Sequence, residues 1–211
     1  MTSRRSFVTA LTSLAALAGA RVDAQTPAPR AAASWDLTWL ETLKGRHKQA
    51  FDVGSFDLAP DTPLRVPMNY LDTFRDVFHL EPPDVNVAIG IARTAFPMNA
   101  SDALWLKYAL GERWNIKDPA TGKPATRNIY LGDAAKPGAT VRSLQARGAI
   151  FWQCNVALGA VAFQLSQAAK TPLDEMRAEL IAGLNPGVKL VPSHTMAVGL
   201  AQEHGLTYEK L

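Results

Sequence analysis

The sequence contains little that would tie it together covalently or anchor it. It has one cysteine, Cys154, among 211 residues, so no disulfide can form within the chain. Charged residues make up only 19% of the total, and no basic cluster interleaved with aromatic residues suggests nucleic-acid binding. No apolar run is long enough for a permanent membrane span. We therefore expect the fold to depend on burial, with neither nucleic acid nor a membrane span involved.

Several common functional motifs are also missing. The four histidines, His47, His79, His194 and His204, contain no His-x-x-x-His pair, so no zinc motif is present. No glycine-rich loop that would bind a dinucleotide or a phosphate occurs either. The aromatic residues Trp105, Tyr108 and Trp114 fit a core or a subunit interface better than a stacking platform. We expect no metal and no cofactor.

The first residues are typical of a targeting signal rather than of a folded domain. "SRRSFV" begins at Ser3 and places two arginines before an apolar run that is too short to anchor the chain in a membrane. The pattern resembles a twin-arginine signal, which predicts export to the periplasm. An ordinary secretory signal with two chance arginines is the alternative. We predict a signal peptide over residues 1–24, with cleavage after Ala24 and with Ala20 as a second candidate.

Removal of the signal peptide changes the charge argument. The chain has a net charge of +3, and without residues 1–24 about +1 remains, so the basic pI says little about partners. Residues 25–45 are predicted to be a tether and N-terminal segment, Pro- and Ala-rich up to about residue 36. Residues 46–211 are predicted to form the folded domain, which is long enough for one good core.

Strand and helix patterns alternate through that domain. Strands are predicted over 47–53, 84–92, 149–154, 187–192 and 206–211, and helices over 62–79, 101–114, 140–148, 155–169, 171–184 and 193–205. In the second strand, valine and isoleucine fill one face while the other face is small enough for a helix to lie on it. Thr171 is expected to cap its helix. Residues 115–139 lack periodicity and predict an ordered excursion or lid. The fold class is α/β, a single three-layer domain with a mostly parallel sheet and helices on both faces.

Candidate site residues follow from the ends of these strands. Ligands of open parallel sheets collect beyond the carboxyl ends of the strands, where helix N-termini point. Arg93, Cys154, Ser193 and His194 each follow or end a predicted strand, and Asn155 begins a helix. A helix dipole and a neighbouring cation stabilise a thiolate, which would make Cys154 a nucleophile. Alternatively, Cys154 is a small buried apolar residue.

The C-terminal half resembles a known family. "AIFWQCNVAL", followed by "GVKLVPSHTMAVGLAQEHGLTYEKL", resembles the DsrE/DsrF-like sulfur-relay proteins, in which a strand ends in a cysteine and a "VPS" strand, an Ala-Gln helix and a Gly-x-x-Tyr strand follow. "DALWLKYALGERWNIKDPATGKPATRN" resembles an exported twin-arginine branch of that family. The resemblance covers roughly residues 46–211. It implies a flavodoxin-like fold, a homo-oligomer and a persulfide-carrying cysteine at Cys154.

Two hypotheses of function follow. In the first, Cys154 accepts sulfur from a small sulfur-containing molecule or a partner sulfur-transfer protein, with Arg93 and His194 supplying positive charge, and Asn155 and Ser193 contacting substrate. His194 stands where the family commonly has glycine. The lack of a second cysteine excludes a dithiol oxidoreductase within one chain. In the second hypothesis the protein is a non-catalytic ligand-binding or scaffold protein, and Cys154 is structural.

Overall fold

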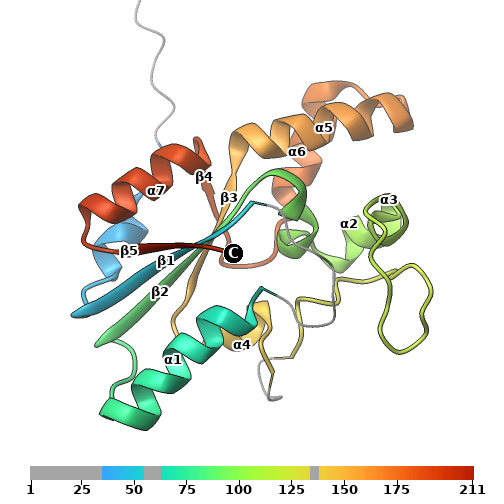
Figure 1. Cartoon of the computed structure of the whole chain (residues 1–211). Coiled ribbons are helices and arrows are strands. Elements are labelled where there is room, and N and C mark those ends of the chain that lie inside the picture. Colours follow the sequence, from blue (N-terminus) through green and yellow to red (C-terminus); the bar gives the residue numbers. More distant parts are fainter. Residues whose placement is uncertain (1–34, 55–62, 134–137) are drawn as a thin grey trace, which may run out of the picture. The chain divides into compact units, whose positions relative to one another are not determined.

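A computed structural model describes residues 35–54, 63–133 and 138–211. The predicted signal peptide and most of the predicted tether lie outside them. Within the described residues five parallel strands form one sheet in the order β4-β3-β2-β1-β5 (Figure 1). The strands are β1 (His47–Val53), β2 (Val85–Ile91), β3 (Ile150–Cys154), β4 (Lys189–Val191) and β5 (Thr207–Lys210). The predicted single α/β domain of flavodoxin-like type is confirmed.

Helices cover both faces of the sheet. One face carries α1 (Arg65–Phe78), α4 (Val141–Ala146) and α5 (Asn155–Ala169), which bury their apolar sides in the larger core. The other face carries α7 (His194–Glu203) and the short 3-10 helix η1 (Thr38–Thr42). The chain crosses the sheet from β1 to β4 over the first face and returns from β4 to β5 over the second. A right-handed crossover that reverses its direction must change faces in this way.

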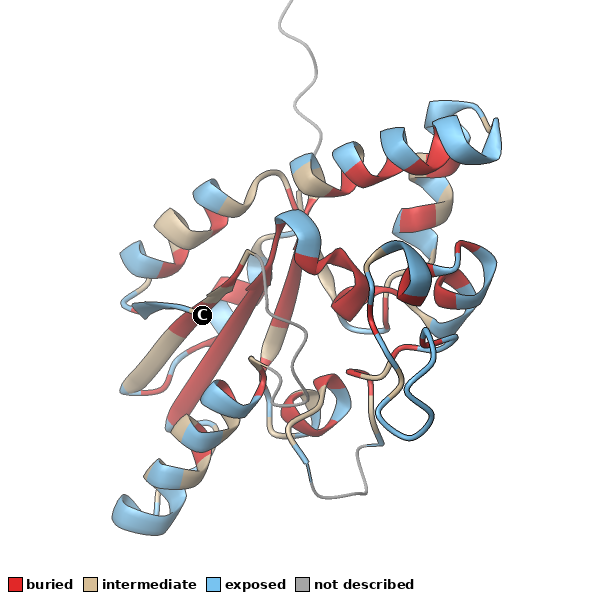
Figure 2. Ribbon diagram, turned by 45° about the vertical axis from the view of Figure 1, so that its right-hand side comes forward, coloured by how far each residue is buried: buried red, intermediate tan, exposed pale blue. Residues whose placement is uncertain are grey.

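The central strand β2 shows why the layers form. All seven of its residues are buried, as Figure 2 shows by colour. Its valines and isoleucines belong to the larger core, whereas Ala88 faces the core beneath α7. Small side chains on that second face let a helix approach closely, as the sequence pattern predicted.

The segment before β1 is part of the fold. No helix or strand was predicted over residues 37–45, yet η1 lies there and Trp39, Leu40 and Leu43 are buried against the second face. The rings of Trp39 and Trp152 stack with their centroids 5.4 Å apart. A five-residue 3-10 helix has too few turns to give a periodic signal, which explains the omission.

The helix predicted over 101–114 is broken. The structure has α2 (Asp102–Lys107) and α3 (Leu110–Arg113), separated by Ala109 in the left-handed region with φ at +48°. A Cβ atom on Gly111 would lie 2.0 Å from the carbonyl oxygen of Ala125, so the following excursion packs directly on the backbone of α3. Neither the left-handed residue nor this tertiary contact is revealed by a helical period.

The helix start predicted at Thr171 is also corrected. Helix α6 (Leu173–Ala182) has Pro172 at its N-cap position and no side-chain capping hydrogen bond. The N–H of Thr171 instead donates to the carbonyl oxygen of Ser166, so Thr171 belongs to the turn that ends α5. Thr171 lies between the end of α5 and the start of α6, and its backbone hydrogen bond belongs to the end of α5.

The excursion after α3 is ordered where it is described. Asn128 is buried, and its amide donates to the carbonyl oxygens of Met98 and Ala100 at 2.9 and 2.7 Å. Its side-chain oxygen accepts from the N–H groups of Tyr130 and Leu131. One asparagine thus ties this stretch to η2 (Arg93–Asn99), the 3-10 helix that follows β2. None of the described helices combines the length and apolar character needed to cross a bilayer.

Candidate functional site

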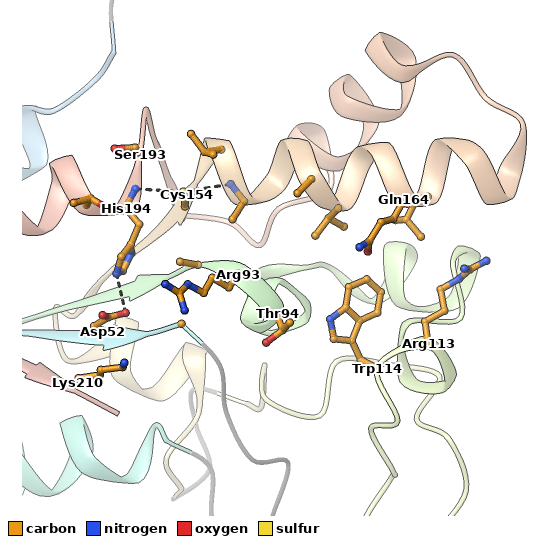
Figure 3. Close-up of a pocket in the computed structure, with 18 residues that line it drawn as sticks. Asp52, Arg93, Thr94, Arg113, Trp114, Cys154, Gln164, Ser193, His194 and Lys210 are labelled. Atoms are coloured by element: carbon orange, nitrogen blue, oxygen red, sulfur yellow. Dashed lines mark hydrogen bonds and ion pairs between the residues drawn. The ribbon is translucent and has the colours of Figure 1, made fainter.

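A pocket of about 890 Å³ lies beyond the carboxyl ends of the strands. Four of the five predicted site residues, Arg93, Cys154, Ser193 and His194, line it together (Figure 3). The strand-end rule therefore located the pocket from the sequence. Asn155 is not among the lining residues, and its side-chain oxygen accepts from a guanidinium N–H of Arg177, on α6.

The sulfur of Cys154 sits between two helix N-termini. Its Sγ accepts from the N–H of Ala157, in the first turn of α5, at 3.4 Å, and from the N–H of His194, the first residue of α7, at 3.2 Å. The strands β3 and β4 are neighbours, but the helices that follow them lie on opposite faces, so both N-termini reach one sulfur. The residue is 5% exposed. The first of these helix N-termini was predicted from the sequence, whereas the second was not, because only the order of the strands brings it to Cys154.

The imidazole of His194 is fixed on both sides. Trp152 donates its indole N–H to Nδ1 at 3.2 Å, so Nδ1 carries no proton and the neutral ring has its proton on Nε2. Nε2 lies 2.8 Å from Oδ1 of Asp52, close enough for an ion pair but not aligned as a hydrogen bond. Burial lowers the pKa of His194, with a smaller contribution from Arg93, and the opposing effect of Asp52 does not cancel it.

This arrangement revises the expected role of His194. We predicted a source of positive charge; in the structure burial lowers the pKa of His194, and the group that this residue points at sulfur is its backbone N–H. The physical reason is burial, which penalises the charged form of the ring. The N-termini of α5 and α7 each place a backbone N–H, and with it positive potential, at Cys154.

Asp52 is a site residue that sequence analysis did not single out. It lies near the carboxyl end of β1, and its Oδ2 accepts from the hydroxyl of Tyr208 at 2.8 Å while Oδ1 faces His194. The hydrogen bond to Asp52 raises the pKa of Tyr208. The strand-end rule that selected Arg93 applies equally to Asp52, so a usable signal was present.

The remaining charged groups of the pocket are cationic. Arg93, Arg113 and Lys210 line it, and among the described residues Asp52 is its one lining carboxylate. Within the described ranges no ion pair involves Arg93, whose φ of +47° places it in the left-handed region. For a residue other than glycine that conformation costs about 1–3 kcal/mol and is often found at functional sites. The charges and the helix N-termini together favour an anionic ligand.

The pocket extends away from the sulfur to a part that sequence analysis also missed. Trp114, expected in a core or an interface, is half-buried and lines the pocket with Gln164. Figure 3 shows these two residues and Arg113 at the end opposite Cys154 and His194. In the part of the chain that the structure describes, no group of three or more histidine, cysteine or acidic side chains could hold a metal ion.

Comparisons with known proteins assign neither a family nor an activity to this chain. The sequence matches no family model and no curated protein. The structure is similar to that of MTH1491 from Methanobacterium thermoautotrophicum, a protein of unknown function, with 16% sequence identity and a TM-score of 0.40, over 78% of this chain and 99% of that chain. The chemistry of the pocket is therefore inferred from the chain's own residues.

Proposed function

We propose that this chain is an exported DsrE-like protein in which Cys154 carries sulfur as a persulfide. The observation that carries the proposal is the position of Sγ, which accepts two backbone N–H groups from two helix N-termini at the edge of a cationic pocket. Such donors stabilise an anionic sulfur, either as thiolate or as persulfide. The motifs around Cys154 and Ser193 that resemble the sulfur-relay family support the same function.

The proposed reaction is a simple exchange between sulfurs. The Cys154 thiolate attacks the terminal sulfur of a donor persulfide, R–S–SH, and a new S–S bond forms on the protein. The S–S bond of the donor breaks, and the electron pair leaves with R–S⁻. No oxidant or reductant is consumed. Because the chain has no second cysteine, the thiolate of a partner sulfur-transfer protein would take the sulfur onward.

The cellular setting belongs to the same proposal. The paired arginines Arg4 and Arg5 and the apolar run after them support twin-arginine export to the periplasm, with cleavage after Ala24. The family resemblance supports assembly into a homo-oligomer. A mass spectrum of protein purified from the periplasm is expected to show a chain that begins at Gln25.

A second function is favoured by one observation. Cys154 is only 5% exposed, and its sulfur caps the N-terminus of α5 through Ala157. A cysteine in this role can be structural, in which case the pocket binds an anion without covalent chemistry. The Cys154→Ala variant would then keep every biological readout and lose only the modest stability of a small core change.

Persulfide loading tests the two functions against each other. Native protein is treated with an organic persulfide, and the mass of the peptide that contains Cys154 is measured by mass spectrometry. We expect the added mass of one sulfur on native protein, its removal by a reducing agent, and no addition on Cys154→Ser. Addition that requires denaturant, together with an intact phenotype of Cys154→Ala, would overturn the carrier function and leave the binding function.

A further inference from the structure

The pocket is much larger than a small sulfur oxyanion requires. Its volume of about 890 Å³ lies in the range of sites that enclose drug-sized organic ligands, roughly 300–1,000 Å³. Cys154 occupies one end of it and contributes only a small part of the wall (Figure 3). The rest of the wall therefore indicates what else the ligand carries besides its sulfur.

One face of α5 forms the long wall. The lining residues of this helix follow each other at helical spacing, and all but one are small or apolar: Val156, Ala157, Ala160, Val161, Gln164 and Leu165. At 1.5 Å per residue, this stripe runs roughly 14 Å along the helix axis. It begins beside Cys154, which caps the same helix. A ligand with its sulfur at Cys154 can thus lay an apolar body along α5.

Polar and aromatic groups gather at the far end of the stripe. The guanidinium of Arg113 is held by a hydrogen bond from its Nε to the carbonyl oxygen of Tyr108 at 2.8 Å. Within the described ranges Arg113 is in no ion pair with a carboxylate, and the residue is exposed, so its terminal N–H groups can reach an anion in the pocket. The half-buried ring of Trp114 and the side-chain amide of Gln164 lie at the same end.

We infer that the donor is an elongated organic persulfide, with an apolar body that lies along α5 and an anionic group that binds Arg113 beside Trp114. This inference rests on the proposed carrier function and names its substrate class. The exchange is the one given above, with R as the elongated acid: its terminal sulfur passes to Cys154 and R–S⁻ leaves with the electron pair. Because Arg113 and Cys154 lie at opposite ends of the pocket, only a ligand of matching length can contact both, so Arg113 selects donors by their length.

Thiosulfonate reagents of graded length test this inference on the full mature chain. Each reagent, R–S–SO₂CH₃, forms a mixed disulfide with Cys154 and releases methanesulfinate, so its rate is read by mass spectrometry. We compare a short carboxylate, a long carboxylate whose length matches the pocket, and the long carboxamide. The long carboxylate is expected to react about tenfold faster than both others, because one charge-assisted hydrogen bond is added.

Variants of Arg113 assign the advantage to its charge. The ratio of long-carboxylate to long-carboxamide rates is expected to fall to near one in Arg113→Gln and to be partly kept in Arg113→Lys. Arg46→Gln is the matched control, because Arg46 is an exposed arginine just before the opposite end of β1; it is expected to keep the parent ratio. Circular dichroism checks that each variant is folded.

The outcomes separate this inference from the function on which it rests. Equal rates for all three reagents on the parent chain, or a ratio that Arg113→Gln leaves intact, would overturn the elongated anionic donor while the carrier function stands. If none of the reagents modifies Cys154 before denaturant is added, the carrier function itself is wrong. A thioether with the same long acid chain cannot react with a thiol, so its binding can be measured by calorimetry on Cys154→Ser. Binding to this variant, and its loss in the double variant Cys154→Ser with Arg113→Gln, would support the pocket assignment independently of the sulfur chemistry.

Discussion

At the scale of single residues, His194 shows how a side chain and its own backbone take separate roles. The ring is held by the indole of Trp152 and faces the carboxylate of Asp52. The backbone N–H of the same residue donates to Sγ of Cys154. Fixing the ring fixes the start of α7, and thereby the direction of that N–H. His194 is a positioning residue, and its effect on Cys154 passes through the helix it begins.

The lowered pKa of His194 predicts that the protein loses stability in mild acid. Above its ordinary pKa of 6.5, the ring is neutral in the folded and the unfolded chain. Below that value the unfolded chain binds the proton first, because burial lowers the pKa in the folded state, so the free energy of unfolding falls. Urea denaturation between about pH 7.5 and about pH 5.5 is expected to show this loss, and His194→Gln is expected to reduce it.

His204 provides the control for this prediction. It is half-buried, and hydrogen bonds to the carbonyl oxygen of Leu200 and to Glu41 raise its pKa. Its contribution has the opposite sign, since it is present at low pH and is lost as pH rises through the raised value. His204→Gln should therefore not reduce the acid loss of the parent chain and should make it larger. An acid loss of the same size in His194→Gln would show that His194 is not its source.

At the scale of helices and strands, the sequence predicted what local periodicity determines. The apolar alternation of β2 and the strand ends at Arg93 and Cys154 followed from spacing, and so did the place of the pocket. Neither Arg113 nor Trp114 was assigned to the site, because their positions depend on the interruption of the helix at Ala109 and on the packing of residue 125 against Gly111. The contact of α7 with Cys154 was missed for a related reason, since no local sequence pattern indicates the order of the strands in the sheet.

Gly90, on strand β2, leaves the space that two side chains near the site occupy. A Cβ atom there would lie 2.3 Å from Cζ2 of Trp152 and 2.6 Å from Cε1 of His194. Overpacking of this kind typically costs about 1–3 kcal/mol, which we expect for Gly90→Ala in urea denaturation. The displaced ring should also change the rate at which iodoacetamide alkylates Cys154.

Gly199 is the matched control for Gly90. It lies inside α7, and an added Cβ would meet nothing within 4 Å. Replacing a helical glycine by alanine removes backbone entropy from the unfolded chain, so Gly199→Ala is expected to stabilise the protein by about 0.5–1 kcal/mol. A Gly90→Ala variant as stable as Gly199→Ala would contradict the close packing of Trp152 on β2.

At the scale of the whole molecule, the sulfur lies where two cores meet. The larger core supports α5, and the smaller core, which contains Trp39, Trp152 and Ala197, supports α7. Cys154 receives one N–H from each of these helices. The site therefore requires both layers to be in place, and the smaller layer is closed by η1, which precedes the first strand.

Trp39 tests whether that first segment supports the site. Its ring is 2% exposed and stacks on Trp152, which holds His194. Truncation of a buried tryptophan typically costs about 3–5 kcal/mol, the loss of unfolding free energy that we expect for Trp39→Ala. Because the cavity would lie directly behind Trp152, iodoacetamide should also reach Cys154 faster under native conditions. Leu106→Ala, at a side chain 70% exposed, is the control and should change stability by no more than about 0.5 kcal/mol. If Trp39→Ala behaved like Leu106→Ala in both measurements, η1 would be a surface attachment, and the second layer would rest on α7 without it.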